Sequence, residues 1–545
     1  MSRAGAFAAG RGVPGPGAMA PQWPYRLALV LLAACALFVL LTFAQHGISN
    51  DEEVQHVYGR LLVDFYTSGF ADRAAFEYKN LYLYGGLFDL VAAVLERFVP
   101  VNVWDLRHLL SAAFGLTGLA GTWLLARRLA GEWAGLLALV VLALTGAWSG
   151  AMFTHTKDVS FAATMVWALY FTTCLLPDLP RPRRAHLAGV GIALGCAFGL
   201  RVGAVFGVFY LTLGVVAAAW LGGTTLRGRL VFLLRAIRAL LPAGLLAFVL
   251  MGLFWPWAVM SPGNLLRAMT TFSHFSFELH TILDGEVMKN GEVPGYYLAS
   301  YLLVRLPELF LLGLGLALLG GLRRMPLLAS IAGRRGALAW LPVVLAVLVP
   351  LAYTLAAVPP LYNGIRHFTF LLPPLAVLAG SGLIAGWTRA ARWPRARLLA
   401  AVACGVLALS HLTVLARLHP YEYVYYNGLA GGVRGAAERW EEDYWADSLR
   451  EAAVQLNAFV AAEGAAARPY SVAVCAESLQ AAVWLAPGLT VTRDWRAADF
   501  FLAPTHMDCD AVLRGRIVGE VRRDGITLAV VRDRRMLTGT ERNPR

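Results

Sequence analysis

The sequence is dominated by apolar runs, each long enough to cross a lipid bilayer as a helix and separated from the next by short loops. A spanning helix needs about 20 predominantly apolar residues. Runs of this kind occupy 26–45, 105–128, 132–150, 159–176, 186–200, 202–222, 234–254, 296–320, 337–357, 367–388 and 397–415. Only 15% of the 545 residues are charged and 58% are hydrophobic, which excludes a soluble globular chain and a disordered one. The sequence therefore predicts a polytopic α-helical membrane protein with about 11 transmembrane helices.

Basic residues predict the orientation of these helices, because Lys and Arg are retained in short cytoplasmic loops. With the N-terminus inside, the inner loops contain the arginines at 127–128, 181–184, 227–238, 323–335 and 389–397. The short outer turns hold only Lys157, Arg201 and Arg366. The net charge of +13 is therefore a topology signal, and nucleic-acid binding is excluded. We predict a multi-pass protein of the cell inner (cytoplasmic) membrane, with a cytoplasmic N-terminus.

The pattern divides the chain into three parts. Residues 1–24, rich in Gly, Ala and Pro, are predicted to form a disordered cytoplasmic leader. Residues 25–415 form the transmembrane module, and its outer loops at about 46–104 and 255–295 are far longer than a connection requires. Residues 416–545 are predicted to form a small extracytoplasmic α/β domain.

Within this C-terminal part, periodicity favours a helix at 446–461 and short strands at 470–474, 499–502 and 526–531. No catalytic motif is recognisable in this C-terminal part. We therefore expect it to have a binding or a covering role. Cys475 and Cys509 both lie here, and an oxidising compartment would permit a disulfide between them.

Unusual polar residues collect on the predicted outer face. Asp51 and Glu52 follow the first span, and Asp158 opens the fourth. The others are Lys79, Tyr82, His155, Lys157, Arg201, Arg366 and His367. Carboxylates suit a general base and cations suit a phosphate that gains charge. For any single residue, a structural ion pair is the alternative explanation. The convergence of all these residues on one face favours a functional site.

Together these motifs resemble those of the GT-C glycosyltransferases, specifically the bacterial relatives of the protein O-mannosyltransferases and the lipid A aminoarabinose transferases. The resemblance covers residues 26 to about 415. It rests on the acidic pair that opens a long first outer loop, on the stretch from Glu77 to Tyr82, and on the second acidic motif from His155 to Asp158. The implied fold is GT-C-like.

The resemblance also implies roles for individual residues. Asp51 is the implied catalytic base, Glu52 its substitute or partner, and Asp158 a carboxylate that orients the acceptor or supports the base. Lys79 and Arg366 are implied to contact the donor phosphate, although Asn80 and Leu81 stand where the family has two prolines. We add Arg201 to the phosphate-binding set, and expect substrate contacts from Tyr82, His155, Lys157 and His367.

The predicted activity is transfer of a monosaccharide, a hexose or a pentose, from a polyprenyl-phosphate carrier to an envelope lipid, glycan or protein. The displacement would invert the anomeric carbon on the extracytoplasmic face. The alternative is a transporter or flippase of a lipid-linked or charged solute, which would place ionisable groups near the middle of the membrane. A divalent metal stays open, because carboxylates are present but their spacing defines no metal site.

Overall fold

The computed structural model describes residues 22–273, 278–324, 331–464 and 468–537, so the predicted leader lies outside the described residues up to position 21. The protein is a polytopic helical membrane protein with a sheet-containing C-terminal part, as predicted. Among the described residues, eight helices are long and apolar enough to span a membrane, or up to ten if each of two bent pairs is one span. The count of about 11 stays a prediction.

The eight long helices are α1 (Trp23–Thr42), α4 (Val103–Ala130), α8 (Thr156–Leu175), α10 (Val205–Gly222), α11 (Leu226–Phe254), α16 (Ile331–Ala357), α17 (Leu372–Ala390) and α18 (Pro394–Leu418). At the place of the predicted fifth span lies the shorter apolar helix α9 (Arg184–Phe198). The centre of the bundle is formed by α4, α8, α17 and the shorter helix α5 (Glu132–Ala143). Most of the side chains of these four helices are buried.

Two predicted runs are broken rather than continuous. The run 132–150 consists of α5 (Glu132–Ala143), α6 (Gly146–Ser149) and α7 (Ala151–Thr154), with a bend of 73° after α5. The run 296–320 consists of α14 (Tyr297–Arg305) and α15 (Glu308–Arg324), bent by 118°. The second break has a direct cause: Pro307 disfavours helical geometry at Leu306, which is extended at ψ 135°.

Both long outer loops are structured. The first contains α2 (Glu52–Thr67) and α3 (Leu87–Leu95). The second contains α12 (Pro256–Met260), α13 (Asn264–Ser273) and a hairpin of β1 (His280–Leu283) and β2 (Glu286–Lys289). The hairpin turn, Asp284-Gly285, has positive φ at both residues, as a tight two-residue turn requires.

The C-terminal part folds around a five-stranded sheet of order β4-β3-β5-β7-β6. Its elements are α19 (Gly432–Ala436), α20 (Leu449–Glu463), β3 (Tyr470–Val474), α21 (Leu479–Ala482), β4 (Leu489–Val491), β5 (Phe500–Pro504), β6 (Arg516–Arg523) and β7 (Ile526–Asp533). The predicted helix and three strands are present, whereas β4 and β6 were not predicted. A disulfide joins Cys475 to Cys509.

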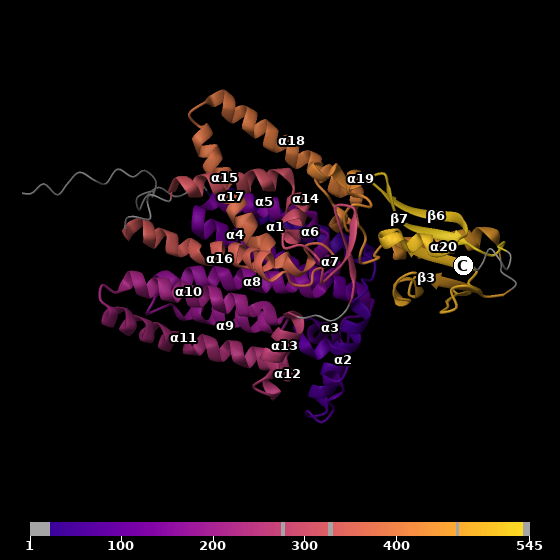
Figure 1. Cartoon of the computed structure of the whole chain (residues 1–545), viewed down its shortest axis with the longest axis horizontal. Helices are drawn as coiled ribbons and strands as arrows, with labels where there is room; N and C mark the ends of the chain where they lie inside the picture. Colours follow the sequence, from indigo (N-terminus) through magenta and orange to yellow (C-terminus); the bar gives the residue numbers. More distant parts are fainter. Residues whose placement is uncertain (1–21, 274–277, 325–330, 465–467, 538–545) are drawn as a thin grey trace, which may run out of the picture.

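Figure 1 shows that α2, α3 and the C-terminal sheet lie at the same end of the helix bundle, while the α10–α11 and α17–α18 connections lie at the opposite end. The arginines of those two connections are among the predicted inner set, and the candidate site residues come from the end that carries the sheet. Which of the two ends faces the cytoplasm remains a prediction from the basic loops.

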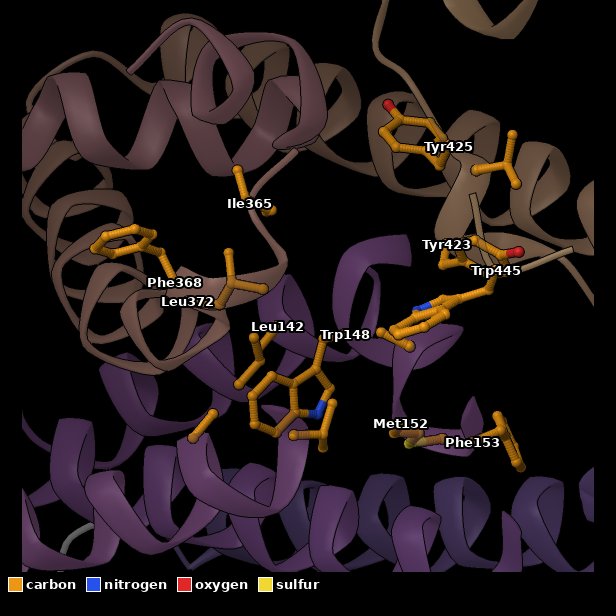
Figure 2. Packing of buried hydrophobic residues seen from close by; sticks show 14 of the residues in the cluster. Leu142, Trp148, Met152, Phe153, Ile365, Phe368, Leu372, Tyr423, Tyr425 and Trp445 are labelled. Carbon is orange, nitrogen blue, oxygen red and sulfur yellow. The ribbon is translucent and has the colours of Figure 1, made fainter. Parts of the chain in front are cut away.

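The C-terminal segment packs directly on the bundle. Tyr423 and Trp445 belong to the same buried cluster as Trp148 and Phe153 (Figure 2). Gly146 permits this approach, because a Cβ there would overlap the carbonyl oxygen of Glu422. The predicted boundary near residue 415 remains a prediction, since side chains from both sides of it share one core.

Candidate active site

Asp51 is a partly exposed carboxylate at the start of the first acidic motif. It immediately precedes α2, and its side chain is 44% exposed. Its Oδ2 accepts a hydrogen bond from Arg366 Nη2 at 2.9 Å. Arg366 begins the short 3-10 helix η7 (Arg366–Leu371) that leads into α17, and its side chain is only 8% exposed. A buried cation therefore holds a carboxylate that remains open to solvent.

Arg366 also connects the first acidic motif to the second. Asp158 lies in the first turn of α8, where a helix N-terminus favours negative charge. Its Oδ2 is 3.6 Å from Arg366 Nε, and its Oδ1 accepts a hydrogen bond from Arg201, which follows α9. We call Asp51, Asp158, Arg201 and Arg366 the outer quartet. The structure brings together these four predicted residues from four distant parts of the chain.

Four other charged side chains form a second cluster, and each of them is at most 5% exposed. Arg107 on α4 donates to Asp89 on α3 at 3.2 Å, and its Nε is 3.8 Å from Glu52 Oε1. Lys157 Nζ is 3.0 Å from the second oxygen of Asp89. We call Glu52, Asp89, Arg107 and Lys157 the inner quartet. Its two acids and two bases compensate one another, as buried charges must.

Glu52 therefore lies in the protein interior and does not face solvent. Its side chain is fully buried, and its Oε2 accepts from the Ser49 amide at 2.8 Å and lies 3.2 Å from His108 Nε2. The Ser49–Glu52 bond joins the chain just before α2 to the first residue of the helix. Lys157 is likewise buried, on Asp89. The predicted roles of Glu52 and Lys157 remain predictions.

His155 is also enclosed. Its Nε2 accepts from Trp445 Nε1 at 2.9 Å and lies 2.6 Å from the hydroxyl of Tyr444, and its residue is 2% exposed. Burial lowers the pKa of His155 well below its ordinary value, and the charges of Arg366 and Arg305 lower it further. The neutral His155 side chain thus holds Trp445 in place. Arg366 lies over the Trp445 ring, with the guanidinium carbon of Arg366 4.2 Å from the ring centre.

The remaining predicted residues lie apart from the outer quartet in their contacts. Lys79 is exposed and its ammonium lies over the Tyr78 ring at 5.9 Å, and among the described residues no ion pair joins it to an acid. Tyr82 packs against Trp257, with 5.2 Å between ring centres. His367, beside Arg366, packs on Tyr362 at 4.7 Å and is partly exposed. Their substrate-binding roles remain predictions.

Sequence reasoning missed Asp89, Arg107 and His108. A signal was present: Asp89 interrupts an apolar helical stretch, and Arg107 and His108 open the second apolar run. Charges at such positions need partners, so each pointed to the other. Tyr84 was missed as well; it is partly buried between two cations, with its ring centre 5.2 Å from Lys157 Nζ and 5.8 Å from the Arg201 guanidinium.

No group of three or more His, Cys, Asp or Glu side chains that could hold a metal ion occurs within the described residues. The carboxylates of the outer quartet are each matched by a guanidinium. What the cluster can do directly is accept a proton at Asp51 and stabilise an anion with two arginines.

No protein-family model and no curated protein matches this chain. Among solved structures, the chain is similar to ArnT from Cupriavidus metallidurans bound to undecaprenyl phosphate, at 15% identity and a TM-score of 0.47, over 94% of this chain and 98% of that chain. It is also similar to the Archaeoglobus fulgidus oligosaccharyltransferase in the apo form, at 13% identity and a TM-score of 0.45, over 83% of this chain and 63% of that chain.

Proposed function

We propose that this chain is a membrane glycosyltransferase that moves a monosaccharide from a polyprenyl-phosphate carrier to an acceptor of the cell envelope. The observation that carries the proposal is the outer quartet: a half-exposed carboxylate, Asp51, held beside two guanidinium groups. This arrangement supports a reaction that takes a proton from an acceptor while negative charge grows on a leaving phosphate.

In the proposed step, the Asp51 carboxylate accepts the proton of an acceptor O–H or N–H group. The acceptor atom forms a bond to the anomeric carbon of the sugar. The bond from that carbon to the phosphate oxygen breaks, and its electron pair leaves with the polyprenyl phosphate. Attack from the side opposite the leaving group inverts the anomeric configuration, so no covalent enzyme intermediate is needed.

Arg366 and Arg201 receive the phosphate charge in this step. Both already bind the carboxylate of Asp158, which holds the two guanidinium groups at one place before substrate arrives. Such preorganised charge needs little rearrangement when the leaving group forms. Lys79, exposed in the first outer loop, is proposed to reach the same phosphate from the solvent side, and Tyr82 and His367 to contact the sugar or the acceptor.

The site is proposed to face the extracytoplasmic side of the inner membrane. Two observations support this side: the basic connections α10–α11 and α17–α18 lie at the opposite end of the bundle (Figure 1), and the disulfide between Cys475 and Cys509 is typical of an oxidising compartment. The donor class, a polyprenyl-phosphate hexose or pentose, follows the resemblance of the motifs. The acceptor is a lipid, a glycan or a protein of the envelope.

The test is turnover by purified protein in liposomes that contain a panel of polyprenyl-phosphate monosaccharides. We expect one donor to be cleaved, with release of free polyprenyl phosphate and transfer of its sugar. Movement of an intact lipid-linked sugar across the bilayer, without cleavage, would instead identify a flippase and contradict the proposal. Mass spectrometry of envelope lipids and glycans from cells with and without the gene would then identify the sugar and the acceptor.

A further inference from the structure

The loop that carries Arg366 is fastened by a tyrosine hydroxyl. The amide of Gly364, two residues before Arg366, donates to the Tyr297 hydroxyl at 3.0 Å, and Tyr297 is fully buried. Gly364 has φ +64°, and a Cβ there would lie 3.1 Å from the Tyr301 ring. The loop thus lies directly on two tyrosines of α14, and glycine is required at the point of contact.

The same hydroxyl continues to a buried carboxylate. The hydroxyl oxygens of Tyr297 and Thr281 are 2.7 Å apart, and Thr281 donates to Glu441 Oε1 at 2.5 Å. Because Thr281 has one hydroxyl proton and uses it on Glu441, the proton between the two hydroxyls must come from Tyr297. Tyr297 then accepts from Gly364. The direction of the whole relay is therefore fixed, from the Gly364 amide to the Glu441 carboxylate.

The relay is buried and held from several sides. Thr281 and Glu441 are both 0% exposed, so neither can replace a lost partner with bulk water. The amide of Glu441 donates to the Tyr301 hydroxyl at 3.2 Å, which in turn donates to the carbonyl of Ile282. Thr281 and Ile282 belong to the β1–β2 hairpin of the second outer loop, so this loop is part of the same assembly.

Glu441 also joins the relay to the C-terminal sheet. His506 follows β5, and its Nε2 lies 3.1 Å from Glu441 Oε2. The neighbouring Thr505 donates to Glu442 at 3.3 Å. The sheet of the C-terminal domain, to which Glu441 also belongs in sequence, therefore contacts the carboxylate at which the relay ends, through residues at the carboxyl end of β5.

We infer that Tyr297, Thr281 and Glu441 are positioning residues that hold Arg366 against Asp51 and Asp158, and that the C-terminal domain acts on the site through His506. The inference rests on the proposed function, in which Arg366 binds the donor phosphate. It gives the C-terminal domain a defined task, which is to keep the phosphate-binding arginine in its place.

The experiment compares full-length variants for binding of undecaprenyl phosphate in detergent micelles and for the KM of donor and acceptor. Tyr297→Phe and Thr281→Val should raise the Kd for undecaprenyl phosphate and the donor KM about tenfold, the size of one lost buried hydrogen bond, with the acceptor KM unchanged. Thr281→Ser, which retains the hydroxyl, should restore both values. His506→Gln should give a smaller rise, about threefold.

Tyr421→Phe is the matched control. Tyr421 is also buried and donates to a carboxylate, Glu451, at 3.2 Å, but lies outside the relay, so its removal should leave donor KM unchanged. Equal changes in donor KM and acceptor KM would indicate a general loss of structure and overturn the inference. So would wild-type undecaprenyl phosphate binding in both Tyr297→Phe and Thr281→Val.

Arg366→Gln separates this inference from the function on which it rests. If Arg366→Gln binds undecaprenyl phosphate as tightly as the wild type, the proposed phosphate role of Arg366 is wrong, and the relay inference is overturned with it. If Arg366→Gln binds weakly while the relay variants bind normally, the function stands and only the relay is refuted.

Discussion

Asp51 and Glu52 are neighbours in the chain, yet they belong to different environments. Asp51 is 44% exposed in the outer quartet, whereas Glu52 is fully buried in the inner quartet. The second acidic motif repeats the division, because Asp158 contacts Arg201 and Arg366 while Lys157 contacts Asp89. Each motif thus contributes one residue to the outer quartet and an adjacent residue to the inner quartet.

The difference lies in what each quartet can exchange with a substrate. In the inner quartet every charge is enclosed by protein, so its members bind only other protein groups. In the outer quartet Asp51 meets solvent and Arg201 is 19% exposed, so an acceptor and a phosphate can reach them. We therefore expect variants of Asp51 to lose activity without stability, and inner variants to lose stability first.

The largest expected effect is on catalysis by Asp51. Asp51→Asn keeps the shape and removes the base, so the transfer rate should fall about 10³-fold. Its thermal unfolding midpoint should match that of the wild type, because the side chain is half exposed. Glu53→Gln is the control: Glu53 lies two residues after Asp51 and is partly exposed, so this variant should transfer sugar normally. An unfolding midpoint of Asp51→Asn well below that of the wild type would contradict the distinction between the quartets.

The next effect is on stability, at Asp89. Asp89→Asn leaves Arg107 and Lys157 short of their shared carboxylate, which should cost about 3–5 kcal/mol of unfolding free energy. Adding Lys157→Met removes the surplus positive charge and should recover part of the loss. Denaturant unfolding in detergent measures both variants. Wild-type stability of Asp89→Asn would show that the inner quartet does not stabilise the fold.

A smaller effect is expected when the charge of Arg366 is kept but its shape is changed. Arg366 uses Nη2 on Asp51 and Nε on Asp158, and a lysine cannot place two nitrogens on two carboxylates. Arg366→Lys should raise the donor KM about tenfold, equivalent to about 1.4 kcal/mol. The measurement is initial rate against donor concentration. An unchanged donor KM would mean that charge alone, without the bridge, suffices.

The smallest effect is a pH dependence at His155, which packs beside the outer quartet. Because burial lowers its pKa in the folded protein, the unfolded state binds the proton more readily below pH 6.5. Stability is therefore complete above pH 6.5 and falls as the pH decreases, by up to about 1.4 kcal/mol per pH unit for this group. His155→Gln should flatten the slope, while His280→Gln, at an exposed histidine, should not.

The slope of the His155→Gln protein should not vanish completely. Burial also lowers the pKa of His46 well below its ordinary value, and the charges of His108, His419 and Arg450 lower it further, so His46 contributes in the same direction. Thermal unfolding midpoints between pH 5 and pH 8, buffered at constant ionic strength, give the comparison. A steeper slope in His155→Gln than in the wild type would contradict the neutral state assigned to His155.

The sequence predicted the parts of the fold that depend on local patterns. Apolar length identified the long helices, and alternation identified β3, β5 and β7. Apolar length did not reveal the bends before Gly146 and after Arg305, because apolar residues continue on both sides of each break, and Pro307 was the sequence signal for the second bend. β6 was missed since half of its eight residues are charged, and β4 has only three residues.

For the site, polarity at helix ends was enough to identify Asp51, Asp158, Arg201 and Arg366 as residues that meet. It was not enough to predict which neighbour faces inward, because Asp51 and Glu52 have the same charge and differ only in their position around the first turn of α2. The partners that decide the matter, Arg107 and His108, lie on a helix distant in sequence. Pairing of this kind is a tertiary property.

The central claim is that the outer quartet is the catalytic site and the inner quartet its support, and one measurement tests it most directly. It is the rate at which Asp51→Asn and Glu52→Gln, assayed side by side as folded protein, release polyprenyl phosphate from a lipid-linked sugar. The account predicts a rate near zero for Asp51→Asn and a substantial rate for each folded molecule of Glu52→Gln. A fully active Asp51→Asn beside an inactive but folded Glu52→Gln would contradict it.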